Sequence, residues 1–335
     1  MSASPPTQPT SAAHPVAQLL AERAASGSQP GARADDASIA LVIEGGGMRG
    51  AVATGMVAGL EGLGLGDAFD SVYGTSSGAI AGAAFLARQT ATGARAYYED
   101  LVDGPFINYR RALRGGPLVS LDYLFNWVIP NVRRFELRRC LDSVIPFTVV
   151  ATRLGADGEC TPDYLTGFTD EDDLLSALRA SCTIPLACGP PMAIRGGTYV
   201  DGALTESIPV RAAFGAGGSG ERPTHALVLL TRPEGELRRP PNLLERRLLY
   251  PLMNRKTTGL GSAHLRQSDD YAAEMRAISA MDNALVISRA ASAVKVGRLE
   301  QDPSVIARGA IEGAAAVHHG LTGRMPALSG ALIGA

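Results

Sequence analysis

Beyond residue 37, short apolar runs alternate along the chain with longer stretches of helical pattern. The short runs have the length of strands, whereas the stretches between them show amphipathic or small-residue faces. We expect strands at 39–44, 69–75, 146–154, 225–231 and 283–288, and a hairpin of 192–194 with 198–200. Helices are expected at 50–63, 77–89, 171–182 and 303–319. The alternation predicts an α/β fold with three layers, in which helices cover both faces of a mostly parallel sheet.

Three segments fall outside this alternation. Residues 1–37 are rich in Ser, Pro, Ala, Gly and Thr, so we expect a disordered N-terminal leader there, apart from two helical turns at 16–23. The folded domain is then expected to span 38–325. Residues 105–140, which include Trp127, and residues 233–260 mix Arg, Leu and Tyr with scattered Pro. We interpret both as cap insertions over the edge of the sheet.

The composition narrows the class of protein. Hydrophobic residues make up 46% of the 335 residues and charged residues 19%, which suits a chain with a full core and excludes global disorder. The net charge of −2 provides no overall field for a nucleic acid, so we expect no such partner. The chain has no apolar run of about 18 residues, and its N-terminus does not resemble a secretory signal. We therefore expect a cytoplasmic protein.

A glycine-rich turn follows the first predicted strand. Its residues are Gly45, Gly46, Gly47, Met48, Arg49 and Gly50. The spacing satisfies G-x-G-x-x-G, and Asp67 and Asp70 lie about twenty residues further on, so a dinucleotide site is one interpretation. Backbone N–H groups before a helix also bind other oxyanions, including a tetrahedral acyl intermediate. A tight turn with no ligand is the third interpretation, because glycine tolerates a positive φ.

The second strand-to-helix turn carries a candidate nucleophile. Residues 74–78 read GTSSG and match G-x-S-x-G, with Ser76 at the centre between Gly74 and Gly78. A strand before this pattern and a helix after it are the context of a nucleophile elbow, which holds the serine on a strained turn. Ser77 is also a serine in the motif, but it lies off the centre and is expected to begin the helix as a capping group.

A serine nucleophile needs a base, and the histidines do not provide a clear candidate. The chain has five histidines, and none of them lies in a turn rich in Gly, Ser or Asp. They are His14, His225, His264, His318 and His319. Asp201 follows a predicted strand and precedes Gly202 and Ala203. A carboxylate there could accept the proton of Ser76 directly. The other interpretation of Asp201 is a common Asp-Gly turn.

Taken together, the three motifs resemble those of the patatin-like phospholipase family of serine acyl hydrolases. They occur in the family's order as GGGMRG at 45–50, GTSSG at 74–78 and DGA at 201–203. Segments 177–191, 194–213 and 229–241 look like a bacterial subgroup, and the resemblance covers about 39–320. Two positions depart from the common pattern: Ser77 stands where Ala is commoner, and Glu44 where Asp is frequent.

The resemblance implies a patatin-like α/β/α domain and a Ser76–Asp201 dyad without histidine. We expect no metal or cofactor, because the sequence has no carboxylate-rich calcium loop and no His/Cys ligand spacing. The resemblance also implies that residues 45–50 form or support the oxyanion hole, and that Gly74, Gly78 and Gly202 support the elbow and the dyad motif. The expected reaction is hydrolysis of a lipid ester through an acyl-enzyme. Acyl transfer to an acceptor other than water is an alternative, and nucleotide binding by the glycine loop is a more distant one.

Several arginines stand among apolar residues in the predicted insertions, at 109–114, 133–139 and 243–250. One interpretation is peripheral contact of these segments with an anionic membrane surface. The other is that they are ordinary solvated helix faces. Glycine is also abundant, at 39 residues. Six of these lie in the two turns at 45–50 and 74–78, and we attribute the remainder to genome composition.

Overall fold

The computed structural model describes residues 13–215 and 222–326. Its centre is an eight-stranded sheet in the order β5-β6-β3-β2-β1-β7-β8, with β4 pairing with β3 outside this path. The strands are β1 (Ile39–Ile43), β2 (Ser71–Thr75), β3 (Phe147–Leu154), β4 (Cys160–Leu165), β5 (Met192–Ile194), β6 (Gly197–Asp201), β7 (His225–Pro233) and β8 (Ala284–Arg289). The five strands from β3 to β8 along this order pair in parallel, whereas β4, β5 and β6 pair antiparallel.

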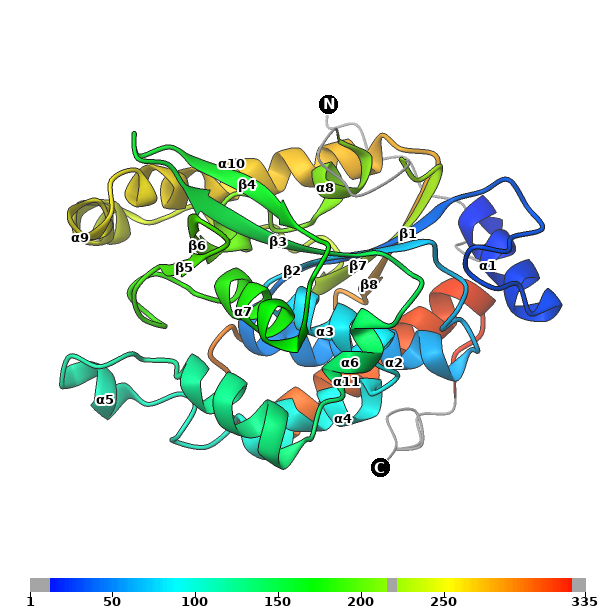
Figure 1. Ribbon diagram of the computed structural model, residues 1–335, viewed down its shortest axis with the longest axis horizontal. Helices are drawn as coiled ribbons and strands as arrows, with labels where there is room; N and C mark the ends of the chain where they lie inside the picture. Colours follow the sequence, from blue (N-terminus) through cyan, green and yellow to red (C-terminus); the bar gives the residue numbers. More distant parts are fainter. Residues whose placement is uncertain (1–12, 216–221, 327–335) are drawn as a thin grey trace.

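Helices cover both faces of the sheet (Figure 1). One face is covered by α2 (Gly50–Gly62), α3 (Ser77–Leu86), α4 (Thr90–Arg95), α6 (Leu137–Leu141), α7 (Glu171–Ser181) and α11 (Pro303–Thr322). The other face is covered by α8 (Val210–Phe214) and α10 (Leu260–Ser279). The core is accordingly divided into a larger cluster on the first face and a smaller one on the second. The predicted three-layer α/β/α fold with a mostly parallel sheet is confirmed.

The strand boundaries follow the apolar runs because the central strands are buried on both faces. All five residues of β1 and all five of β2 are buried, as expected for parallel strands between helical layers. The sequence pattern did not predict β4. That strand lies outside the main order, and residues between its buried ends are only half buried or exposed, so it lacks an apolar run.

The prediction of a disordered leader is wrong for residues 13–37. Helix α1 (Pro15–Ser26) begins after His14, whose side chain accepts a hydrogen bond from the Val16 N–H. Val16 and Leu20 are buried in the main core. Arg23 is buried as well and donates to the Ala68 carbonyl at 2.8 Å and to Asp70 at 2.7 Å. The composition of residues 1–37 gave no indication of the short apolar stripe and the buried arginine that together hold this helix against the core. Residues 1–12 lie outside the described part of the chain.

Both predicted insertions lie at the end of the molecule toward which the parallel strands run, on the left of Figure 1. The first contains α5 (Tyr109–Leu113) and η4 (Tyr123–Val132), with η3 (Ala96–Asp100) before it. The second contains η6 (Glu245–Leu249) and α9 (Tyr250–Lys256). The short turns η2 (Gly47–Arg49) and η5 (Gly202–Leu204) complete the elements. Across the described part of the chain, no helix is both long and apolar enough to cross a membrane.

The arginine segment at 133–139 is compensated by neighbouring carboxylates. Arg133 pairs with Asp100 and, at 2.6 Å, with Glu99. Arg138 pairs with Asp142 at 2.9 Å, and Arg139 pairs with Glu136. Three of the four arginines in this segment are therefore paired with carboxylates, and only Arg134 has no ion-pair partner among the described residues.

Candidate active site

Ser76 lies in the turn between β2 and α3, in a backbone conformation that non-glycine residues rarely adopt. Its φ of 55° and ψ of −127° place it outside the common regions, which is the strain typical of a nucleophile elbow. The turn is possible because α3 begins very close to β1. A Cβ atom on Gly78 would lie 2.4 Å from the Ile43 carbonyl oxygen and 2.7 Å from that of Glu44. Only glycine fits there.

Ser76 and Asp201 are in direct contact, although 125 residues separate them. The Ser76 hydroxyl donates to Asp201 Oδ2 at 2.7 Å, and the Ala203 N–H donates to Asp201 Oδ1 at 2.8 Å. The contact arises because β2 and β6 both flank β3, which brings the end of β6 beside the elbow. A Cβ atom on Gly202 would lie 2.1 Å from the Val150 carbonyl oxygen, so this approach also requires glycine.

The dyad is largely shielded from solvent. Ser76 is 5% exposed and Asp201 is 6% exposed. Burial raises the pKa of the Asp201 carboxyl above its ordinary value, because removal of water disfavours the charged form. The hydrogen bond from Ser76, the positive charge of Arg298, the Ala203 N–H and the charge of Arg238 act in the opposite direction. Asp201 is thus a carboxylate whose basicity is increased by its surroundings.

A second serine, Ser181, holds the elbow in place. Its hydroxyl accepts a hydrogen bond from the Ser76 N–H at 2.8 Å and donates to the Val150 carbonyl at 2.6 Å. Ser181 is the last residue of α7 and is fully buried. The sequence analysis assigned it no role, although it lies within segment 177–191 of the family resemblance. One serine among several near a helix end carries no distinctive pattern.

The glycine loop approaches the elbow from the end of β1. Most of its backbone N–H groups are already engaged in hydrogen bonds. The Gly45 N–H donates to Ser207 O, the Gly46 N–H to Ser77 Oγ and the Met48 N–H to Arg298 O. The Arg49 N–H donates to Gly46 O and the Gly50 N–H to Gly47 O. The Gly47 N–H has no hydrogen-bond partner among the described residues, and neither has the Ser77 N–H. Gly47 has a φ of 62°, and its Cβ would lie 2.7 Å from the Arg298 carbonyl oxygen. The loop therefore has one free backbone donor, at a position that requires glycine.

The side chains of Glu44 and Arg49 both contact residues at the end of β7. Glu44 is completely buried, pairs with Arg232 and accepts from the Thr231 N–H at 2.6 Å. Arg49 is 7% exposed, and its Nε donates to the Thr231 hydroxyl at 3.4 Å. Both side chains thus attach the loop to the end of β7.

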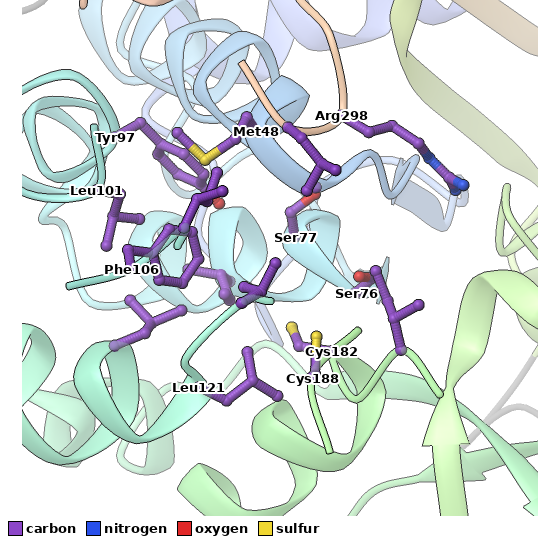
Figure 2. Close-up of a pocket in the computed structure, with 17 residues that line it drawn as sticks. Met48, Ser76, Ser77, Tyr97, Leu101, Phe106, Leu121, Cys182, Cys188 and Arg298 are labelled. Atoms are coloured by element: carbon purple, nitrogen blue, oxygen red, sulfur yellow. The ribbon is translucent and has the colours of Figure 1, made fainter. Parts of the chain in front are cut away.

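A narrow apolar cavity of about 60 Å³ opens beside Ser76 (Figure 2). Side chains from the glycine loop, η3, the first insertion and the turn after α7 line it: Met48, Tyr97, Leu101, Phe106, Leu121, Leu124 and Ile184 are among them. Cys182 and Cys188 lie at its wall near Ser76. Burial raises the pKa of both thiols, so both remain protonated and weakly nucleophilic.

The residues of the dinucleotide interpretation do not come together. Asp70 precedes β2, and its N–H donates to the Ile39 carbonyl, at the opposite end of the strands from the glycine loop. Its carboxylate pairs with Arg23 and Arg33 at 2.7 Å, while Asp67 pairs with Arg88. Neither acid faces the loop. No histidine forms a hydrogen bond with Ser76 or Asp201, and the described residues contain no cluster of three His, Cys, Asp or Glu side chains that could hold a metal ion.

A serine on a strand–turn–helix elbow at the edge of a mostly parallel sheet is an arrangement found in hydrolases. A family model described as patatin-like phospholipase matches residues 41–214, more than half of the chain, and includes the glycine loop, the elbow and Asp201. The chain therefore belongs to the patatin-like phospholipase family, a family of lipid acyl hydrolases.

Two similar proteins place this match in context. The uncharacterized protein YjjU of Escherichia coli strain K12 is 29% identical over 177 residues, which are 52% of this chain and 48% of that protein. The chain thus spans about half the length of this curated relative. Among solved structures, the crystal structure of VipD from Legionella pneumophila is similar with a TM-score of 0.42 and 11% identity, over 86% of this chain and 67% of that one.

Proposed function

We propose that this protein hydrolyses carboxylic esters of lipids, with Ser76 as nucleophile and Asp201 as general base. The observation that carries the proposal is the 2.7 Å hydrogen bond from the Ser76 hydroxyl to a buried carboxylate, made from a strained elbow. A base must lie within hydrogen-bond reach of the proton it removes, and Asp201 meets this requirement. Its raised pKa strengthens it as a base.

The reaction proceeds in two acyl transfers. Ser76 Oγ forms a bond to the ester carbonyl carbon while its proton passes to Asp201. The bond to the alcohol then breaks, and the alcohol leaves with that proton, which leaves an acyl-enzyme. In the second transfer water attacks the acyl carbon, gives a proton to Asp201, and releases the acid as Ser76 regains its hydroxyl proton.

The negative charge that develops on the carbonyl oxygen needs donors that are not already engaged. The free N–H groups of Gly47 and Ser77 are the candidates, because both residues line the cavity beside Ser76. Such preorganised donors stabilise an oxyanion most effectively where water is excluded. The resemblance implies an oxyanion hole formed by residues 45–50. We propose that within this loop the Gly47 N–H is the donor, and that the Ser77 N–H of the elbow is the second donor.

The acyl portion of the substrate belongs in the apolar cavity. Leu101, Phe106, Leu121 and Leu124 on its wall offer apolar contacts to a hydrocarbon chain and no charge. At about 60 Å³ the cavity is small, which favours esters with short acyl chains. The insertion at 105–140 contributes five of the residues that line the cavity, Phe106, Ile107, Val119, Leu121 and Leu124, so we propose that this segment helps to select the acyl group.

The experiment that tests the proposal is labelling with a fluorophosphonate ester, together with hydrolysis of p-nitrophenyl butyrate. Ser76→Ala should lose labelling and reduce kcat by roughly 10³-fold or more. Asp201→Asn should reduce kcat by roughly 10²–10⁴-fold, the usual contribution of a general base. The matched controls are Ser292→Ala and Asp269→Asn, which change exposed residues of the same types. Labelling that survives in Ser76→Ala would falsify the assignment of the nucleophile.

Product analysis separates hydrolysis from acyl transfer. With water alone the acyl-enzyme yields the free acid, whereas an enzyme that prefers another acceptor yields a new ester or thioester when an alcohol or thiol is added. We expect the free acid to remain the main product. A predominant ester or thioester would assign the protein to the transferases and leave the dyad unchanged.

A further inference from the structure

Helix α10 places a buried carboxylate against the chain segment that follows Asp201. Glu274 of this helix is only 5% exposed. Its Oε1 accepts a hydrogen bond from the Ser207 N–H at 3.1 Å, and its Oε2 accepts one from the Ile208 N–H at 3.1 Å. Both oxygens of one side chain thus hold two consecutive backbone N–H groups.

The same segment reaches the glycine loop beside the nucleophile. The Ser207 carbonyl accepts the Gly45 N–H at 3.2 Å. Gly45 lies directly against the elbow, because a Cβ atom there would be 2.6 Å from the Thr75 carbonyl oxygen and 3.1 Å from the Ser76 Cβ. A continuous path of contacts therefore leads from Glu274 through the Ser207 backbone and Gly45 to the elbow.

The two hydrogen bonds of Glu274 require a carboxylate rather than any polar side chain of this size. A glutamine has a single oxygen, so its NH₂ group would face the second N–H donor and leave that donor without an acceptor. A protonated glutamic acid has the same difficulty, since one of its oxygens carries a hydrogen. Burial of a charged group costs free energy, so a buried carboxylate in this position indicates a specific role.

The ionisable groups around Glu274 do not simply stabilise its charge. Glu206, on the same segment, is fully buried and accepts a hydrogen bond from the Tyr164 hydroxyl of β4 at 2.9 Å. Arg211 of α8 lies between the two carboxylates, at 3.6 Å from Glu206 and 4.0 Å from Glu274. Burial raises the pKa of Glu274 to about 8, and Glu206 adds to this increase, whereas Arg211 and the two N–H groups oppose it.

We propose that Glu274 is a positioning residue for the reaction at Ser76, because its carboxylate fixes the 207–208 backbone and thereby holds the glycine loop against the elbow. This rests on the proposed ester hydrolysis and on the Gly47 N–H as oxyanion donor. Glu274 itself touches neither the substrate nor the reacting atoms. Loss of one of its two hydrogen bonds displaces the loop donor and weakens stabilisation of the oxyanion. The walls of the acyl cavity are unchanged, so kcat carries the effect and KM does not.

The test measures kcat and KM for p-nitrophenyl butyrate from about pH 6 to about pH 10, corrected for uncatalysed hydrolysis. Wild-type kcat should rise about tenfold through a midpoint near pH 8, as Glu274 becomes ionised. Glu274→Gln keeps the shape of the protonated side chain, so it should match the wild type at the acidic end, lack the step and leave KM unchanged. Glu22→Gln removes an exposed carboxylate from α1 and should retain the step. A step that is missing from the wild type, or that persists in Glu274→Gln, overturns the proposal.

Glu206→Gln shows which of the two buried carboxyl groups is responsible. Glu206 raises the pKa of Glu274, so its replacement should keep the step in kcat and move the midpoint to lower pH. A step that disappears in Glu206→Gln would assign the ionisation to Glu206 and overturn the role of Glu274.

Stability measurements separate positioning from a purely structural role. The folded protein binds the Glu274 proton more tightly than the unfolded chain does, so ionisation between its ordinary pKa of 4.5 and about 8 lowers the wild-type free energy of unfolding. Glu274→Gln lacks this loss. In urea unfolding it should therefore gain stability relative to the wild type between about pH 6 and pH 9, while its kcat falls relative to the wild type. If stability and kcat fall together, the role is structural and the proposal is overturned. Ser76→Ala should lose hydrolysis at every pH, which tests the proposed function independently of Glu274.

Discussion

Asp201 combines burial with a short contact to the nucleophile. Burial raises the pKa of its carboxyl, and the nearby guanidinium groups of Arg298 and Arg238 keep that increase in check. A dyad without histidine needs this balance, because an ordinary aspartate is a weak base whereas a strongly desolvated one would be protonated at neutral pH. The positive charges of Arg298 and Arg238 therefore act directly on the residue that we assign as the base.

The pH dependence of the reaction follows from this balance. Protonated Asp201 cannot accept the Ser76 proton, so kcat/KM for a neutral ester should fall as the pH drops through the Asp201 pKa. The midpoint should lie above 3.8, the ordinary aspartate value, because burial raises the pKa. Arg298→Gln should move the midpoint to higher pH, since Arg298 lowers this pKa, whereas Arg276→Gln should not move it. A midpoint at or below 3.8 would contradict this account.

At the scale of elements, small residues permit a close contact between α2 and α11. α2 packs against α11, and 11 of its residues, from Gly50 to Leu60, are buried. A Cβ atom on Gly55 would lie 2.1 Å from the Ala310 carbonyl oxygen, and one on Gly313 would lie 2.5 Å from that of Val52. Our attribution of the remaining glycines to genome composition is therefore wrong at these positions, where glycine allows two backbones to approach.

A matched pair of substitutions on α2 tests this packing. Gly55→Ala should lower the free energy of unfolding by about 1–3 kcal/mol, because the added methyl group separates α2 from α11. Gly62→Ala, on the same helix, meets nothing within 4 Å and should raise the free energy of unfolding by about 0.4–1 kcal/mol. Urea unfolding monitored by circular dichroism measures both changes. Equal effects at the two positions would show that helix contact is not the cause.

At the scale of the whole molecule, the two insertions present apolar side chains and unpaired arginines at one end. Leu113 is 88% exposed, Trp127 is 55% exposed and Leu243 is 76% exposed. Arg110 and Arg247 form no ion pair with any described residue. We propose that this end contacts anionic membrane surfaces, since basic and apolar side chains together favour the lipid interface.

Trp127 provides a direct measurement because it is the only tryptophan in the chain. Vesicles of phosphatidylglycerol should shift its fluorescence to shorter wavelength as the indole leaves water, whereas phosphatidylcholine vesicles should have little effect. Leu113→Asp should weaken vesicle binding in co-sedimentation, while Ser292→Asp, which introduces the same charge outside the two insertions, should not. Binding that ignores the content of anionic lipid would argue for ordinary solvated helix faces.

The sequence alone determined most of the sheet and the motifs at its edge. The central parallel strands are buried on both faces, so they appear as apolar runs, and tight strand-to-helix turns restrict Gly74 and Gly78 to glycine. These constraints act on residues that are close together in the chain, so they produce a recognisable pattern in the sequence. The same reasoning placed Asp201 at a strand end and made it a candidate base for Ser76, and the family resemblance then favoured this role over an ordinary Asp-Gly turn.

Tertiary structure decided which groups meet. Ser181 reaches the Ser76 N–H only because α7 ends beside the elbow, and β4 is held by its pairing with β3 rather than by an apolar run. Helix α1 is ordered by Arg23, whose partners follow it by 12 to 47 residues. The cavity that Arg49, Arg232, Arg238 and Arg298 line brings together residues from four distant segments. Such sites arise when residues that are far apart in the sequence pack together. None of these residues forms a distinctive local pattern, so the sequence alone does not reveal the site.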